Sequence, residues 1–227
     1  MNNIYRKELK YIISEDKYLN IKNMMDVIME PDRHGENGRY MVRSQYYDSL
    51  TDCDLHDNLD GVYDKKKIRI RIYSPDAENG KLEYKCKYGS DGIKHSLTLS
   101  REEIGKMENG QYDFLLERDE ELARHLYIKI NKYKYSPKTI IEYDRTAYMY
   151  PISDLRITYD RNIRATINPY GILEKEPMYI PLMTPDKGIL EIKYNDFFPA
   201  ALRPLIYVLD NAAEAYSKYS QSRLKFL

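Results

Sequence analysis

The feature that most constrains this chain is a repeated alternation of charged and large apolar residues. It occurs in four segments, Lys67–Ile72, Glu83–Lys87, Leu155–Asp160 and Ile189–Tyr194. Alternate side chains of a β-strand point to opposite faces of the sheet, so each segment predicts a strand with one ionic and one apolar face. Two interpretations are open: the ionic faces meet water on an ordinary sheet, or they converge inside a closed barrel around an anion.

Composition limits the functions that these faces can serve. The chain has 227 residues with 36 basic and 36 acidic side chains, so no net field draws it to nucleic acid. Its cysteines, Cys53 and Cys86, form no CxxC pair, which favours a reducing cytoplasm. No apolar run approaches the roughly 18 residues of a membrane span. We therefore expect one cytoplasmic domain over residues 1–227 that binds no nucleic acid and has no membrane span of its own.

The pattern of the whole chain predicts an α+β fold rich in antiparallel strands. Period-two alternation predicts strands over residues 4–13, 40–48, 67–73, 81–88, 94–99, 138–149, 154–160, 163–167 and 187–194. N-cap and helical-spacing signals predict helices after Ser14, after Ser100 and over about 113–134. A further apolar stripe predicts one C-terminal helix that includes Leu202, Leu209 and Tyr216.

The basic strand faces carry the main functional signal. Lys67, Arg69 and Arg71 share one face of a predicted strand, as do Glu83, Lys85 and Lys87 of the next. An unpaired buried charge costs several kcal/mol, so an ionic interior must stay wet and be partly neutralised by carboxylates. A polyanion would neutralise it further, since guanidinium groups match phosphate oxygens in shape and charge. The residues alone therefore favour a phosphate-chain tunnel, with a solvated sheet face as the alternative.

A set of short motifs, in order along nearly the whole chain, resembles a known family. It is similar to the catalytic domain of vacuolar transporter chaperone (VTC) polyphosphate polymerases in its bacterial form, among the CYTH-like triphosphate tunnel metalloenzymes. The motifs are Arg6–Tyr11, Tyr46–Ser49, Lys67–Tyr73, Leu82–Lys85, Gly92–Lys94, Glu142–Ala147, Arg156–Asp160, Leu190–Lys193 and Ser217–Ser220.

The resemblance implies a fold and an activity. The expected fold is a closed, antiparallel, eight-stranded β-barrel with helices packed on its outside and a triphosphate in its lumen. The expected activity is ATP-dependent polyphosphate synthesis, in which the γ-phosphoryl group of ATP is transferred to a growing polyphosphate chain with Mn²⁺ or Mg²⁺ as cofactor. Expected ligands are ATP and polyphosphate, or triphosphate or pyrophosphate, and a separate membrane protein is a possible partner.

The resemblance also assigns roles to residues of this sequence. The catalytic, phosphate-binding set is Lys10, Arg69, Arg71, Lys85, Lys94, Arg145, Arg156 and Lys218. Further substrate-binding residues are Tyr143, Lys67, Lys87, Lys193 and Ser220. Glu191 and Glu8 are the expected metal ligands, because Mg²⁺ and Mn²⁺ prefer oxygen ligands and often use only one or two carboxylates.

Two departures from the family pattern bear on the activity. Hydrolase relatives carry Glu-x-Glu-x-Lys on the first strand, whereas this chain has Arg6 at the first acidic position, followed by Glu8 and Lys10. This difference argues against an inorganic or nucleoside triphosphatase, which is the first alternative function. The second is a non-catalytic module that binds polyphosphate or nucleotides. Gln221 replaces a lysine of the eukaryotic polymerases, which bears on chain translocation rather than on phosphate binding.

Other constellations in the sequence have simpler interpretations. The four histidines lack the HxH or HxxxH spacing of a zinc site, and we interpret them as surface residues. The acidic segment Asp52–Asp57 lacks the glycine and terminal glutamate of a calcium loop and is expected to form a polar loop or short helix. Cys86 alternates with Lys85 and Lys87 and is therefore expected to pack in the core.

Overall fold

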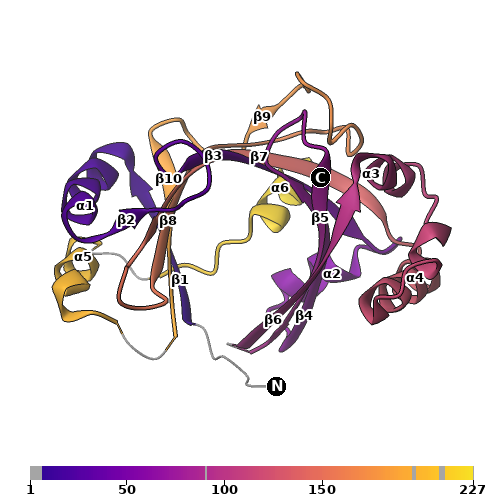
Figure 1. Ribbon diagram of the computed structural model, residues 1–227, viewed down its shortest axis with the longest axis horizontal. Helices are drawn as coiled ribbons and strands as arrows, with labels where there is room; N and C mark the ends of the chain where they lie inside the picture. The colour runs from indigo at the N-terminus through magenta and orange to yellow at the C-terminus, as the bar shows by residue number, and fades with distance from the viewer. Residues whose placement is uncertain (1–6, 90, 196–197, 210–212, 227) are drawn as a thin grey trace. The chain divides into compact units, whose positions relative to one another are not determined.

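The alternating segments all form strands in the computed structural model, which describes residues 7–89, 91–195, 198–209 and 213–226 (Figure 1). The strands are β1 (Lys7–Ser14), β2 (Glu30–Pro31), β3 (Arg39–Asp48), β4 (Asp64–Ile72), β5 (Asn79–Tyr88), β6 (Asp91–Ser100), β7 (Ser136–Met149), β8 (Arg156–Ala165), β9 (Ile180–Pro181) and β10 (Lys187–Tyr194). The helices are α1 (Glu15–Ile28), α2 (Cys53–Leu59), α3 (Arg101–Glu108), α4 (Glu121–Tyr133), α5 (Arg203–Val208) and α6 (Lys218–Phe226). Short 3₁₀ turns, η1 (Asp113–Leu116) and η2 (Ala200–Leu202), precede α4 and α5.

The predicted α+β class is confirmed, but the closed eight-stranded barrel is wrong. The sheet has ten strands in the order β1-β10-β8-β7-β3-β4-β5-β6, with β2 beside β7 and β9 beside β8. Within the described residues β1 and β6 are its two edges and are not joined. On the β1 edge the backbone oxygen of Lys10 accepts a hydrogen bond from the Glu214 N–H at 2.8 Å, so a non-strand segment meets this edge. Exposed, charged strands such as β6 are typical of edges that stay unpaired.

The described chain divides into two units. The first unit comprises Met1–Met41, Tyr143–Ile163 and Met183–Tyr216. The second comprises Val42–Glu142, Arg164–Leu182 and Ser217–Leu227. Strands β3, β7 and β8 contribute residues to both.

The core of the first unit lies between helix α1 and the apolar faces of its strands. Ile21 and Met25 of α1 are fully buried beside Ile157, Leu190 and the neighbouring apolar residues of β8 and β10. Helix α1 begins as the sequence predicts, because the Ser14 side chain accepts a hydrogen bond from the Lys17 N–H. Helix α5 packs against α1 in the same unit.

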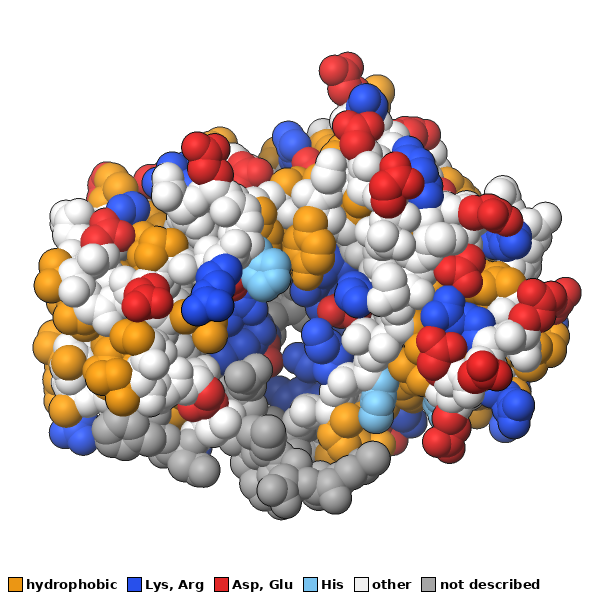
Figure 2. Space-filling model, viewed as in Figure 1, with side chains coloured by type: hydrophobic (Ala, Val, Ile, Leu, Met, Phe, Trp, Pro, Cys, Tyr) orange, Lys and Arg blue, Asp and Glu red, His pale blue; other side chains and the backbone are white. Residues whose placement is uncertain are grey.

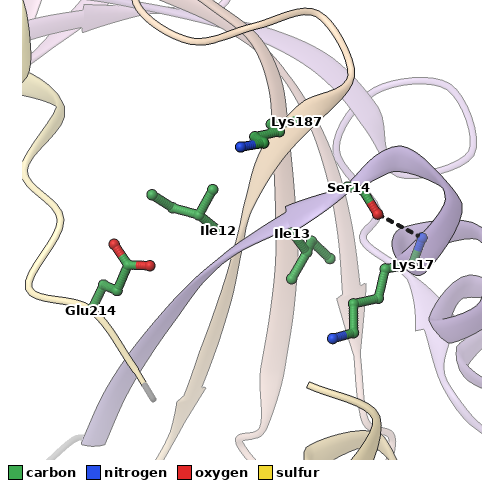
Figure 3. A pocket seen from close by; sticks show the side chains of 6 residues that line it. All are labelled: Ile12, Ile13, Ser14, Lys17, Lys187 and Glu214. Atoms are coloured by element: carbon green, nitrogen blue, oxygen red, sulfur yellow. Dashed lines mark hydrogen bonds between the residues drawn. The ribbon is translucent and has the colours of Figure 1, made fainter. Parts of the chain in front are cut away.

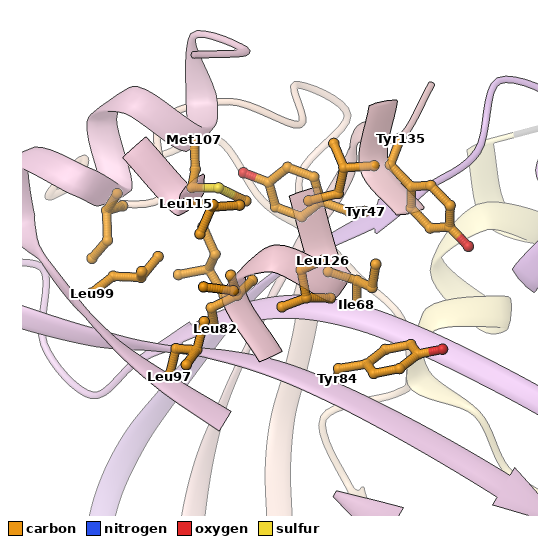
Figure 4. Close-up of a cluster of buried hydrophobic side chains, with 14 of the residues drawn as sticks. Tyr47, Ile68, Leu82, Tyr84, Leu97, Leu99, Met107, Leu115, Leu126 and Tyr135 are labelled. Atoms are coloured by element: carbon orange, nitrogen blue, oxygen red, sulfur yellow. The ribbon is translucent and has the colours of Figure 1, made fainter. Parts of the chain in front are cut away.

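The core of the second unit lies on the apolar faces of β4, β5 and β6, which α3 and α4 cover (Figures 1 and 4). Ile68 of β4 and Leu82 of β5 pack in one cluster with Leu115 of η1 and Leu126 of α4 (Figure 4). Cys86 is buried in this cluster, which confirms its predicted core position. Since helices cover the apolar face, the ionic face of the same strands lies on the opposite side of the sheet.

Several element boundaries differ from the sequence-based predictions. The two strands predicted over 154–160 and 163–167 form the single strand β8. The predicted C-terminal helix is wrong beyond Val208, since residues 213–217 are not helical and α6 begins only at Lys218. Asp52–Asp57 belongs largely to helix α2, in line with the expected short helix. Residues 4–6 of the first predicted strand, including Arg6, lie outside the described residues.

The surface carries both signs of charge. On the face shown in Figure 2, acidic and basic side chains lie close to one another, as expected from 36 of each in the chain. Among the described residues, no helix is long and apolar enough to cross a membrane.

Candidate functional site

The second unit carries an ionic face on strands β3 to β6, which we call the β4 face. The antiparallel register places Tyr46 of β3 opposite Arg69 of β4, and Arg69 opposite Glu83 of β5. One step along, Lys67, Lys85 and Lys94 lie in a row across β4, β5 and β6. The register thus brings together cations that are far apart in the sequence, because paired residues of neighbouring strands point to the same side.

Glu83 is the acidic centre of the β4 face and is only 3% exposed. Its carboxylate lies 2.6 Å from Arg69 Nη2, 3.2 Å from Lys94 Nζ and 3.8 Å from Arg71 Nη1. Burial acts to raise the pKa of Glu83, but the charges of Arg69, Arg71 and Lys94 prevail and lower the pKa to about 2. The Glu83 side chain is therefore ionised at neutral pH and partly neutralises three of the predicted phosphate-binding residues.

Helices α2 and α6 supply polar groups to the same face. The Lys67 ammonium donates hydrogen bonds to Asn58 Oδ1 at 3.0 Å and to Ser217 Oγ at 2.8 Å. Asn58 also donates to Ser220 Oγ at 2.9 Å, so Asn58 of α2 links Lys67 to Ser220 of α6. Lys218 lies at the start of α6, and its charge acts on Tyr46.

The remaining predicted residues of the second unit lie on the same side of the sheet. Lys85 is half-buried between Lys67 and Lys94 in the register. Lys87 is exposed and lies opposite Lys65, one row farther along. The β4 face thus includes the predicted site residues on the strands of the second unit, and these side chains range from nearly buried to exposed.

The first unit carries a second ionic face on β1, β10 and β8, which we call the β10 face. Glu8, Lys193 and Arg156 form one row across these strands. The next row is Lys10, Glu191 and Thr158. The opposite side of the same strands joins the core below α1, so the predicted division into ionic and apolar faces is confirmed here too.

Glu191 is the acidic centre of the β10 face and is 6% exposed. Its carboxylate lies 3.0 Å from Lys193 Nζ, 3.8 Å from Lys10 Nζ and 3.9 Å from Arg145 Nη2. Glu8 lies 2.8 Å from the same Lys10 ammonium. Two carboxylates from neighbouring strands therefore approach one cationic group, and their oxygens are of the type that Mg²⁺ and Mn²⁺ prefer.

Glu8 and Glu191 are the carboxylates that the sequence analysis expects to hold a divalent metal ion, and this assignment stays a prediction. No group of three or more His, Cys, Asp or Glu side chains suited to a metal occurs among the described residues. The donor set of Glu8 and Glu191 fits an ion that takes most of its ligands from phosphate oxygens and water.

Arg145 and Arg156 are held by carboxylates that the sequence analysis did not assign. Arg145 donates from Nε and Nη2 to the two oxygens of Asp160, at 2.7 and 2.8 Å. Its guanidinium group also lies 5.2 Å from the centre of the Tyr143 ring. Arg156 donates to Asp32 at 2.6 Å and to the Tyr40 hydroxyl at 2.8 Å.

Sequence reasoning gave no role to four residues of these faces: Glu83, which it placed on the same strand face as Lys85 and Lys87, and Tyr46, Asp160 and Asp32. Glu83 and Asp160 share the strand parity of the predicted basic residues, so the alternation contained the signal for both. Tyr46 belongs to a motif that was recognised but given no role. Asp32 precedes a loop without periodicity, and nothing in the sequence indicated its contact with Arg156.

A cleft of about 460 Å³ lies elsewhere in the first unit and includes none of the predicted site residues (Figure 3). It is lined by Ile12, Ile13, Ser14, Lys17, Lys187 and Glu214. Ile12 continues the strand side that carries Lys10, but with an apolar residue, so the ionic face ends before this cleft.

Comparison with known proteins supports the family that the motifs indicate. The family model of the VTC domain matches residues 5–227, whereas no curated protein matches the chain. A candidate adenylate cyclase from Bacillus halodurans is 12% identical with a TM-score of 0.57, covering 96% of this chain and 98% of its own.

A candidate adenylyl cyclase from Hippeastrum, described as having a dominant triphosphatase activity, is 12% identical with a TM-score of 0.55. That match covers 97% of this chain and 96% of the Hippeastrum chain. At this identity the two structures show a likeness of fold alone. The family match spans almost the whole sequence, and the chain therefore belongs to the VTC-domain family.

Proposed function

We propose that this chain is an ATP-dependent polyphosphate polymerase that acts as one functional domain over residues 1–227. In this proposal the γ-phosphoryl group of ATP is transferred to the end of a polyphosphate chain and ADP leaves. The β4 face and the β10 face both bind phosphates of the substrates. The proposed compartment is the cytoplasm.

The observation that carries the proposal is the concentration of cations around a buried carboxylate on each face, Glu83 on the β4 face and Glu191 on the β10 face. On the β4 face three cations surround Glu83 within 3.8 Å. On the β10 face three surround Glu191 within 3.9 Å. On the β4 face one carboxylate cannot neutralise all three cations, whereas on the β10 face Glu8 and Asp160 also pair with Lys10 and Arg145. The remaining positive charge is available to an anion, and linked phosphates supply negative charge at regular spacing.

The residue types suit phosphoryl transfer. In this reaction the protein mainly positions the substrates and stabilises charge on the transferring group. Arg69, Arg71 and Arg145 offer planar donors that match phosphate oxygens, and Lys85 and Lys94 offer compact charges. The attacking group is already an anionic phosphate terminus at neutral pH, so no general base is required.

Glu191 and Glu8 would hold the divalent metal ion, either Mn²⁺ or Mg²⁺. When bound there, the ion would neutralise charge on phosphate oxygens. Lys10 contacts both carboxylates and would reorient toward phosphate as the ion takes its position. Glu191→Gln should therefore weaken metal binding while leaving the fold intact.

The second candidate function is a triphosphatase, which the likeness to the Hippeastrum protein favours. In that reaction water replaces the polyphosphate terminus as the attacking group. Arg6 weighs against it, because this chain lacks the first carboxylate of the hydrolase pattern. A binding module without turnover is the remaining alternative.

The products formed from ATP distinguish these functions. Purified protein with ATP and Mn²⁺ should give ADP together with long polyphosphate, measured on a gel. Release of orthophosphate alone would replace the polymerase by a triphosphatase, and tight binding without turnover would replace it by a binding module. Glu191→Gln should abolish turnover, whereas the exposed Glu102→Gln on α3 serves as a matched control and should retain it.

A further inference from the structure

Tyr46 occupies a central position on the β4 face but has no role in the set of residues assigned from the family. It lies on β3 directly opposite Arg69 and is 6% exposed. Its hydroxyl oxygen accepts a hydrogen bond from Arg69 Nη1 at 2.9 Å. Arg69 itself is 21% exposed, so a ligand can reach the group next to this hydroxyl.

The ring of Tyr46 and its hydroxyl have different surroundings. The ring stacks on Tyr219 of α6, with centres 5.2 Å apart, and Tyr219 in turn donates a hydrogen bond to the buried Asp48. The hydroxyl of Tyr46 is an acceptor in its contact with Arg69, and no acceptor for its own proton lies within hydrogen-bonding distance among the described residues. The ring therefore serves packing, while the O–H group keeps one unused donor.

The charges around this donor are almost all positive. Arg69 and Arg71 approach from β4 and Lys218 from α6, with Glu83 of β5 behind Arg69 and the neutral Tyr219 at the ring. Burial acts to raise the pKa of Tyr46, but these cations prevail and lower it. Tyr47, the next residue, has its pKa raised by burial, which shows that the effect belongs to the ionic side of the strand.

We propose that Tyr46 is a phosphate-binding residue, whose hydroxyl donates a hydrogen bond to a phosphate oxygen held by Arg69 and Arg71. The proposal rests on the proposed function, because it takes linked phosphates as the ligand of the β4 face. When a phenol oxygen accepts a hydrogen bond from an arginine, its own O–H becomes a stronger donor. A phosphate oxygen is a charged, strong acceptor, and the surrounding cations favour it at this position. Ionisation of Tyr46 would remove the donor and add a negative charge beside the ligand.

The test is equilibrium binding of tripolyphosphate to the full chain by calorimetry, with Tyr46→Phe compared with the wild type. The variant keeps the ring and its packing on Tyr219 but loses the O–H group. At pH 7.5 it should bind about tenfold more weakly, the expected loss for one hydrogen bond to a charged group. Tyr47→Phe on the other side of β3, where the hydroxyl bonds Gln45, is the matched control and should bind as the wild type does.

The pH dependence of the affinity distinguishes a hydrogen bond donated by the Tyr46 hydroxyl from a packing role of that hydroxyl. The ratio of wild-type to Tyr46→Phe affinity cancels the protonation of the ligand and of the lysines, and it should fall toward one as pH rises from 7.5 to 10. Equal affinities at pH 7.5, or a tenfold loss that is constant with pH, would overturn the proposal while leaving the proposed function intact. A wild type that binds no tripolyphosphate would overturn both. Failure of Tyr46→Phe to fold would assign the hydroxyl a structural role instead.

Discussion

Removal of the Glu83 charge should destabilise the folded chain by a predictable amount. Three cations lower the pKa of Glu83 from its usual value of 4.5 to about 2. At about 1.4 kcal/mol per pKa unit, the ionised carboxylate stabilises the fold by roughly 3 kcal/mol at neutral pH. Glu83→Gln keeps the shape of the side chain and removes this charge, so the free energy of unfolding at pH 7 should fall by about 3 kcal/mol.

The effect has a defined pH window. Because the pKa of Glu83 is lower in the folded state, the unfolded chain binds more protons between pH 4.5 and 2. The stabilisation is therefore complete above about pH 4.5 and is lost as pH falls through about 2. By pH 3 the difference between wild type and Glu83→Gln should shrink to roughly 1.5 kcal/mol.

Urea denaturation at pH 7 and pH 3 measures both quantities. The control is Glu102→Gln, which removes an exposed carboxylate that pairs with Lys106 on the same helix and should change stability little. A loss below 1 kcal/mol at pH 7, or an equal loss at both pH values, would refute the argument that Glu83 neutralises the β4 face.

Three further predictions follow from other contacts of the two faces. Arg69→Ala should lower the melting temperature more than Arg71→Ala, since Arg69 lies 2.6 Å from Glu83 and Arg71 lies 3.8 Å away; equal losses would contradict this. Asp160→Asn should destabilise the chain to urea by about 3 kcal/mol or more, because the buried Arg145 loses its closest ionic partner. Burial and the neighbouring Asp48 raise the pKa of Asp54 to about 7, so the folded state is destabilised where Asp54 ionises. Asp54→Asn should therefore raise the melting temperature at pH 8 and change it less at pH 5, and the opposite order would exclude this cause.

The strand faces could be predicted from the sequence because their signal is local. Alternation fixes which side chains share a face, and the cations of β4 and β5 therefore lie together as expected. Closure of the sheet is a different property, since it depends on which groups meet its edges. The contact of Glu214 with Lys10 joins residues about 200 positions apart, and no periodicity indicates it.

The C-terminal helix shows a second limit of periodicity. Leu202, Leu205 and Leu209 are buried as the apolar stripe predicts, yet the helix ends at Val208. Tyr216 continues the same spacing in a segment that is not helical. Helical spacing thus identified these three buried leucines, whereas Ile206 of the same stripe is 36% exposed. It could not determine where the helix ends, because tertiary contacts override local propensity.

The two buried glutamates differ in a way that the motifs alone do not reveal. Two cations lie within 3.2 Å of Glu83, one of them an arginine that also donates from Nε at 2.7 Å. Among the described residues, only Lys193 lies within 3.2 Å of Glu191, while Lys10 and Arg145 are 3.8 and 3.9 Å away. A carboxylate whose oxygens are already bound offers few lone pairs to a metal ion, whereas one with longer contacts keeps them available. The contacts therefore favour Glu83 as the carboxylate that neutralises the cations of the β4 face, and Glu191 as the metal ligand of the β10 face. Metal titration of Glu83→Gln and Glu191→Gln would reverse this assignment if the first variant lost the metal and the second retained it.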